Sequence, residues 1–219
     1  MAPLSAAQSV EQHRYLKKTG SVIIPFNWQL EQGDNLKLTT DLGKERDITR
    51  MDADFSTQSW SIDDPTAKTK MGVFRNGNEL TFSGVFKDKK IERTVTIDAA
   101  PWYQALSLSL RQFTDPSREH IEFWSIRPDN LAIHHLQVTR EAEEILTLEG
   151  ISSTAIKLKI RLTGLKSAFW SCYYWLRKSD GVFIRYEGPS GPPGWPLTIV
   201  ELIDTSAQAK LDGDLQQVQ

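Results

Sequence analysis

The sequence has one cysteine, little net charge and no long hydrophobic run, and each of these shortages excludes a class of protein. Cys172 has no second cysteine to pair with, so an internal disulfide is impossible. The formal net charge is -2 at pH 7, and Lys and Arg are scattered among acids, which leaves no basic patch for a nucleic acid. No apolar run approaches the roughly 20 residues that a membrane-spanning helix needs.

The hydrophobic content is nevertheless high enough for a sizeable core. Hydrophobic residues make up 39% of the 219 residues, and seven residues are tryptophan. A chain of this size buries roughly 70% of the surface that it exposes when unfolded, which excludes intrinsic disorder over most of its length. We expect a single domain over residues 20–205, after a leader and short N-terminal helix in residues 1–19 and before a polar tail in residues 206–219.

Short runs that alternate apolar and polar residues dominate the sequence from Val22 to Ile203. In residues 154–162, four aliphatic side chains alternate with lysine or arginine, as in a strand with one buried face. The Asn76-Gly77 pair predicts the tight turn of a hairpin, because both residues tolerate a positive φ. Neighbouring strands joined this tightly must be antiparallel. The predicted fold is therefore mainly β, with a single large curved antiparallel sheet that forms a half-barrel or an open barrel.

Two helices are predicted beside this sheet. Residues 5–17 carry a weak apolar stripe, with Ser9 as an N-cap and Gly20 as a stop. An amphipathic helix is expected at residues 101–113, where Pro101 occupies the first turn. Its apolar side chains recur at helical spacing, at Trp102, Leu106, Leu110 and Phe113.

The segment of residues 168–177 differs from the other predicted strands because large apolar side chains fall on both of its faces. Trp170 and Tyr174 lie on one face, and Tyr173 and Trp175 on the other. Neither face can be left wholly in water. The helix at residues 101–113 is the available cover, and a curved sheet with such a cover can enclose a cleft of several hundred cubic ångströms.

No residue pattern indicates a metal, a cofactor or a catalytic centre. The neighbours His134 and His135 point to opposite faces of a strand and cannot grip one ion together. Cys172, between large aromatic residues, is typical of a small buried hydrophobe and not of a nucleophile. In the glycine-rich stretch at residues 188–196, prolines remove the amide hydrogens that a phosphate cradle needs.

The first seven residues, Met1 to Ala7, resemble the small-residue end of a secretory signal whose apolar region is missing. This favours a periplasmic or otherwise exported protein from which a signal peptide has been removed. An ordinary cytoplasmic N-terminus is the alternative.

Three segments together give the chain a resemblance to the periplasmic lipoprotein carriers and related half-barrels of outer-membrane biogenesis, and to some uncharacterised exported bacterial domains. They are Phe74-Arg75-Asn76-Gly77, the stretch from Asp98 to Tyr103, and the hairpin that runs from Tyr174 through Asp180-Gly181. The resemblance is one of topology. It implies a curved sheet around a hydrophobic cavity closed by helices, and it implies binding of acyl chains or of lipidated proteins.

The leading hypothesis is a non-enzymatic, monomeric module that binds a hydrophobic ligand or an acylated partner between sheet and helix. No cofactor, metal or nucleic acid is expected. The candidate ligand-binding residues are Trp102, Leu106, Trp124, Trp170, Tyr174 and Trp195.

Two alternatives remain open at this point. Exposed tryptophan rings could stack on sugars, which would make the chain a carbohydrate-binding or surface-interaction module. Paired carboxylates such as Asp63-Asp64 or Glu143-Glu144 could serve a hydrolase, provided that both face one cleft.

Overall fold

The fold is known from a computed structural model, which describes residues 9–33, 35–164, 170–189 and 195–203. Most of the predicted leader and the predicted polar tail lie outside these residues.

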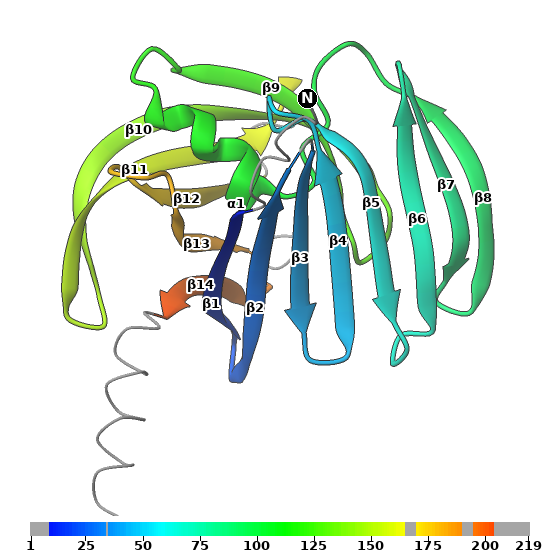
Figure 1. The fold of residues 1–219 in the computed structure, drawn as a ribbon, viewed down its shortest axis with the longest axis horizontal. Coiled ribbons are helices and arrows are strands. Elements are labelled where there is room, and N and C mark those ends of the chain that lie inside the picture. Colours follow the sequence, from blue (N-terminus) through cyan, green and yellow to red (C-terminus); the bar gives the residue numbers. More distant parts are fainter. Residues whose placement is uncertain (1–8, 34, 165–169, 190–194, 204–219) are drawn as a thin grey trace, which may run out of the picture.

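All of the strands belong to one antiparallel sheet, as Figure 1 shows. Their spatial order is β8-β7-β6-β5-β4-β3-β2-β1-β14-β13-β12-β11-β10-β9. The bounds are β1 Ser9–Thr19, β2 Val22–Gln32, β3 Leu36–Leu42, β4 Glu45–Met51, β5 Thr57–Asp64, β6 Thr69–Asn76, β7 Glu79–Phe86, β8 Lys89–Thr96, β9 His120–Ile126, β10 Ile133–Leu148, β11 Ile151–Leu162, β12 Ser171–Arg177, β13 Phe183–Pro189 and β14 Leu197–Ile203.

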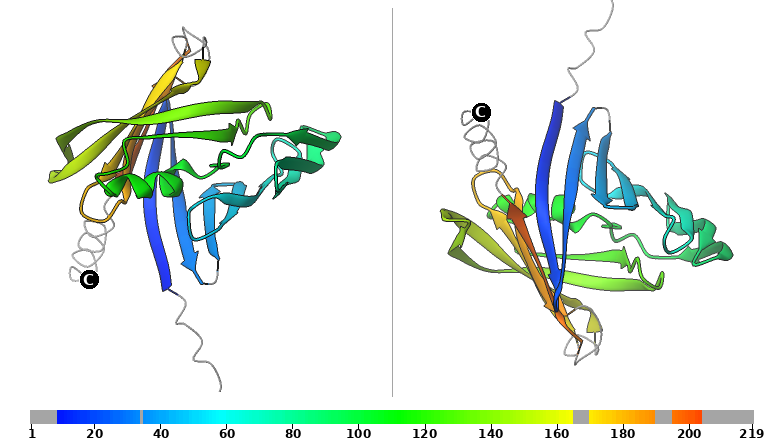
Figure 2. Two further views of the ribbon diagram at one scale, coloured as in Figure 1. Left: turned by 90° about the horizontal axis from the view of Figure 1, so that it is seen from above. Right: turned by 90° about the horizontal axis from the view of Figure 1, so that it is seen from below.

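The first and last strands lie side by side in the middle of this sheet. β1 pairs with β14 from Arg14↔Ile203 to Thr19↔Thr198, and it pairs with β2 on its other side. The sheet therefore has two halves, β1 to β8 and β9 to β14, and it ends at β8 and β9 without closing on itself. Figure 2 shows the two halves folded toward each other with the helical segment between them. The predicted curved antiparallel sheet is confirmed.

Two clear sequence patterns reappear in the structure. A tight turn joins β6 to β7 as predicted, but it is shifted by one residue: Asn76 pairs with Glu79, so Gly77 and Asn78 form the turn, and Gly77 has a φ of 57°. In β11, Ile156, Leu158 and Ile160 are buried on the inner face of the sheet. The alternation of apolar and polar residues thus fixes the register of these strands, because a slip of one residue would turn the apolar side chains outward.

The prediction of an N-terminal helix is wrong, because residues 9–19 form β1. This strand is paired along its length by β2 and over residues 14–19 by β14. Such pairing satisfies backbone groups through partners far away in the sequence, and it outweighs a weak local helical preference.

The inserted helix is shorter than predicted. Helix α1 spans Leu106–Ser109 and continues as a 3-10 turn, η1, over Leu110–Thr114. Residues 101–104 are extended instead, because their backbone pairs with the sheet: Trp124 N donates to Pro101 O and Tyr103 N donates to Trp124 O, each at 2.8 Å. Neither described helical segment has the length and apolar character needed to cross a membrane.

The main hydrophobic core lies between this helical segment and both halves of the sheet. Leu108, Leu110 and Phe113 pack with inward-facing residues of the strands, among them Leu176 of β12. A second cluster joins Trp102 to the β5–β8 side of the sheet.

Both faces of the aromatic strand β12 are covered, as the sequence requires. The helical segment covers only the inner face, which carries Cys172 and Leu176. On the outer face, Trp175 packs with Ala155, Val182 and Ile184. The cover on this side thus comes from neighbouring strands of the same sheet.

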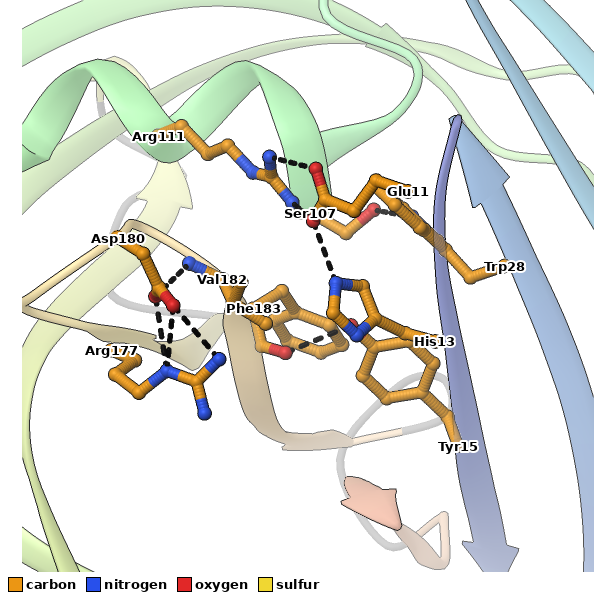
Figure 3. A network of polar contacts seen from close by, with 10 residues as sticks. All are labelled: Glu11, His13, Tyr15, Trp28, Ser107, Arg111, Arg177, Asp180, Val182 and Phe183. Atoms are coloured by element: carbon orange, nitrogen blue, oxygen red, sulfur yellow. Dashed lines mark hydrogen bonds and ion pairs between the residues drawn. The ribbon is translucent and has the colours of Figure 1, made fainter. Parts of the chain in front are cut away.

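A polar network fastens the helical segment to β1 and β2, as Figure 3 shows. Arg111 donates to both carboxylate oxygens of Glu11, at 2.8 and 2.6 Å, and its guanidinium lies over the Trp28 ring. The Trp28 indole in turn donates to Ser107 Oγ at 3.0 Å. Partial burial alone would raise the pKa of Glu11, but hydrogen bonds from Arg111 and His13 outweigh it and lower that pKa to about 2.

Replacing Glu11 with glutamine (Glu11→Gln) should lower the free energy of unfolding by about 2 kcal/mol near neutral pH, because Arg111 is then left largely buried without an anionic partner. A carboxyl whose pKa is lowered on folding stabilises the protein above its ordinary pKa and loses that effect as the pH falls. The difference between wild type and variant should therefore shrink as the pH falls from 4.5 to about 2. Urea denaturation at several pH values measures both effects.

Glu92→Gln is the matched control, because Glu92 forms its ion pair with Lys90 where both side chains are mostly exposed. Its unfolding midpoint should stay close to that of the wild type. Equal destabilisation by the two variants would show that the Glu11 network does not hold the helical segment.

Candidate functional site

The concave side of the sheet contains a hollow of about 1050 Å³. It is bounded by strands of both halves and by Leu106 and Ser107 of α1, so the helical segment covers one side. The volume is at the upper end of the range found for sites that hold small molecules.

The wall of this hollow is mostly apolar. Inward-facing positions on several strands supply rings that contact one another: Tyr174 is tilted against Phe183 and meets Tyr186 edge-on. The aromatic side chains that line it are Phe26, Trp28, Trp60, Phe86, Trp170, Tyr174, Phe183, Tyr186 and Trp195. Rigid rings of this kind offer a large apolar contact surface at a small cost in side-chain entropy.

Carboxyl groups interrupt this apolar wall. Glu45, Asp47 and Asp64 line the hollow together with Lys17. Burial raises the pKa of Asp47 to about 7, and the nearby carboxylates of Glu45 and Asp64 act in the same direction; a hydrogen bond with Trp60 and the charge of Lys17 oppose it. Burial, followed by Asp64, also raises the pKa of Glu45. Among the described residues, Asp47 Oδ1 is buried without a hydrogen-bond partner.

Four of the six predicted ligand-binding residues line the hollow: Leu106, Trp170, Tyr174 and Trp195. Trp102 and Trp124 lie elsewhere. The Trp102 side chain is fully buried in the second cluster and donates to Gln104 Oε1. Trp124 stacks on His135 with ring centroids 4.5 Å apart and donates to Asp98 Oδ1 at 2.7 Å.

Other lining residues were missed from the sequence. Phe26 and Trp28 alternate along β2 with residues that point outward, so their pattern could have placed them on the inner face. No local signal marks Asp47, because its environment depends on Trp60 and Asp64 of the neighbouring strand β5 and on the charge of Lys17 of β1.

The structure does not join the paired carboxylates into one cleft. Asp63 forms an ion pair with Lys70 and Asp64 lines the hollow, so the two point to opposite faces of β5. Glu143 pairs with Lys178 at 2.6 Å. Glu144 accepts a hydrogen bond from Trp175, which belongs to the outer cluster of the sheet.

The histidine pair and the single cysteine, considered above as candidate site residues, also have defined positions in the structure. His134 lines the hollow, whereas His135 stacks on Trp124, so the pair points to opposite faces as expected. In the part of the chain that the structure describes, no three His, Cys, Asp or Glu side chains are grouped to hold a metal ion. Cys172 is buried as expected, and burial raises the pKa of its thiol.

No protein-family model matches the chain, and no curated protein does. Among solved structures, it is similar to the β-barrel-like protein of domain of unknown function DUF1849 from Brucella abortus, with a TM-score of 0.58 and 8% identity over 88% of this chain and 95% of that one. This likeness confirms the fold and carries no information about a ligand.

Two further structures match with lower scores. One is a LolA superfamily protein from Nitrosomonas europaea, with a TM-score of 0.29 and 8% identity over 91% of this chain and 86% of that one. The other is a DUF1329 family protein from Desulfovibrio piger, with a TM-score of 0.27 and 10% identity over 90% and 84%.

Asp47→Asn should change how stability depends on pH. A carboxyl whose pKa is raised on folding favours the folded state while it is protonated, and this effect is lost as the pH rises from its ordinary pKa of 3.8 through about 7. The asparagine variant lacks this loss, so above pH 7 it should be more stable than the wild type by roughly 2–4 kcal/mol. Urea denaturation at increasing pH measures the difference.

Asp63→Asn provides the comparison, since Asp63 precedes Asp64 on β5 but faces outward to Lys70. Its stability should follow the wild-type pH dependence. If the stability of Asp47→Asn also showed the wild-type pH dependence, Asp47 would ionise in the folded protein as it does in water.

Proposed function

We propose that the chain is a non-enzymatic binding module that holds a hydrophobic ligand, such as an acyl chain or the acyl group of a lipidated partner, in the hollow of its sheet. The observation that carries this proposal is the unfilled volume of about 1050 Å³ behind an aromatic wall. Each methylene group moved from water into such a wall contributes about 0.8 kcal/mol. A ligand of moderate length would thus gain enough free energy to bind.

The distribution of polar groups supports a ligand that is apolar over most of its length. Trp170, Tyr174 and Tyr186 come from one half of the sheet, whereas Glu45 and Asp47 come from the other. A long ligand would contact rings along its body and carboxyl groups on one side. We also propose that the protein is exported and acts as a monomer.

For the carbohydrate-binding alternative, one described tryptophan ring is exposed enough to stack on a sugar. Among the described tryptophans, Trp195 is the one with a largely exposed side chain, at 60%. Trp195→Ala on a glycan array addresses this alternative, because sugar binding that disappears in this variant would favour it over the hydrophobic ligand.

Thr40→Trp should abolish ligand uptake while the fold is retained. Thr40 lies on β3 and lines the hollow, so an indole at this position fills space that a ligand would use. We expect the wild-type protein to bind N-phenyl-1-naphthylamine with enhanced fluorescence and to release lipid in native mass spectrometry. The variant should bind the dye at least about tenfold more weakly.

Thr39→Trp is a closely matched control, because Thr39 is the preceding residue on β3 and does not line the hollow. It should bind the dye like the wild type. Absence of dye binding and of co-purified lipid in the wild type would refute the proposed function, and equal binding by both variants would place the ligand outside the hollow.

A further inference from the structure

Exposed apolar side chains gather at one end of the sheet, where the β1–β2 turn meets the start of β14. Val22, Ile23 and Trp195 are 56%, 59% and 60% exposed, and Ile24 and Leu197 are exposed as well. We call these five residues the apolar tip. Isolated surface hydrophobes are ordinary, but a contiguous group marks an interaction site.

The pairing of the strands makes the group contiguous. Thr19 pairs with Val22 across the β1–β2 turn and with Thr198 on β14. A Cβ atom built on Gly20 would lie 3.9 Å from Pro196 Cβ, so the turn also touches the segment between Trp195 and Leu197. The two segments are thus neighbours although they are far apart in the sequence.

Both faces of the tip are apolar. Lys17 and Thr19 line the hollow, so their cross-strand partners Ile24 and Val22 lie on the same inner face. Ile23 pairs with Lys18 on the outer face. Leu197 also lies outward, because the next residue along β14, Thr198, lines the hollow.

The tip stands at the rim of the hollow. Trp195 belongs both to the tip and to the lining of the hollow. Lys87 and Asp129, which are exposed, line the hollow from other turns, so the hollow reaches solvent at this edge of the sheet.

The shape of the tip fits a lipid surface better than a protein surface. A stable protein interface has roughly 20–30 residues on each side, whereas the tip presents five. A projecting turn that is apolar on both faces needs a medium that surrounds it, which the boundary between lipid headgroups and acyl chains provides. Tryptophan is enriched at that boundary.

The charge at this edge complements an anionic lipid surface. The β1–β2, β3–β4, β5–β6 and β7–β8 turns lie at the same edge, as Figure 1 shows. Taken with three residues of each flanking strand, the β1–β2 and β7–β8 turns (residues 17–24 and 84–91) each have a net charge of +2, the β3–β4 turn (residues 40–47) has -1 and the β5–β6 turn (residues 62–71) has none. The four turns together have a net charge of +3, whereas the whole chain has -2. Lysines near the surface of an anionic membrane strengthen binding.

We propose that the apolar tip inserts into the surface of an anionic lipid bilayer and brings the mouth of the hollow against it. This docking goes beyond the proposed ligand binding and does not require that a ligand be carried. The proposed partner of the apolar tip is lipid. Association with a protein or with a second copy of the chain is the competing outcome.

The test is flotation of the protein with vesicles of phosphatidylcholine, alone or mixed with phosphatidylglycerol. The wild type should float with the mixed vesicles, and added salt should weaken the binding. Ile23→Asp and Leu197→Asp should each reduce the bound fraction about tenfold, because a charge then replaces an inserted apolar side chain. Bromine-labelled acyl chains should quench the wild-type protein more than Trp195→Phe, which would place that ring in the bilayer.

Phe74→Asp is the matched control, since Phe74 on β6 is 57% exposed but lies away from the tip. It should float like the wild type. Absence of vesicle binding, or equal binding by Ile23→Asp, would overturn the proposal. Self-association of the wild type that Ile23→Asp abolishes, without vesicle binding, would overturn it in favour of a protein interface.

Dye binding separates this proposal from the proposed function. Ile23→Asp should still bind N-phenyl-1-naphthylamine like the wild type, because Ile23 does not line the hollow. A variant that keeps dye binding and loses flotation shows that its fold is intact.

Discussion

The hollow depends on the extended segment at residues 101–104, which ties the two halves of an open sheet together at one end. Trp102 O accepts a hydrogen bond from Thr57 N at the start of β5, and Tyr103 N donates to Trp124 O on β9. Gln104 adds a side-chain bond from its Nε2 to Ile126 O at 3.0 Å. These bonds join β5 to β9, which are far apart in the order of the sheet. The sheet cannot flatten while they persist, and its concave side stays enclosed.

The same tie explains why one end of the concave side is solid and the other is hollow. Directly after it, α1 and η1 place Leu108, Leu110 and Phe113 between the halves, and all three are fully buried. Among the residues that the structure describes, no further helix lies toward the opposite edge, where Thr40, Asp47 and Ala67 line the space. Small and polar side chains at this position leave space unfilled, and the rings that line the hollow from both halves leave a volume of about 1050 Å³ between them. The cavity is therefore a consequence of where the helical segment ends.

The sequence was informative where a strand has one apolar and one polar face, as β11 does. It misled at β1, because the inner face of that strand carries Glu11, His13 and Lys17, so the alternation of apolar residues is absent. Pairing with β2 along its whole length and with β14 over residues 14–19 holds β1 in the sheet, and no local pattern reveals the pairing with β14. The predicted start of the inserted helix at residue 101 is wrong for the same reason. Residues 101–104 pair with β9 instead, and α1 begins only at Leu106. Four of the large apolar residues chosen from the sequence line the hollow, but size alone does not distinguish Trp170, which lines the hollow, from Trp102, which fills the core.

The antiparallel meander also accounts for the concentration of unusual features at one edge. In such a sheet, alternate turns lie at opposite edges. The edge that contains the β2–β3, β4–β5 and β6–β7 turns is occupied: Glu11 holds Arg111 there, and Ile97 N donates to Asn78 O. The opposite edge carries the β1–β2, β3–β4, β5–β6 and β7–β8 turns. Asp47, whose pKa is raised, the lysines of the β1–β2 and β7–β8 turns and the apolar tip lie there. The helical segment covers the hollow on the side of the first edge, and the exposed residues Lys87 and Asp129 line it at the second. The lining residues that reach solvent, the exposed apolar residues and the lysines therefore coincide at one edge for a topological reason.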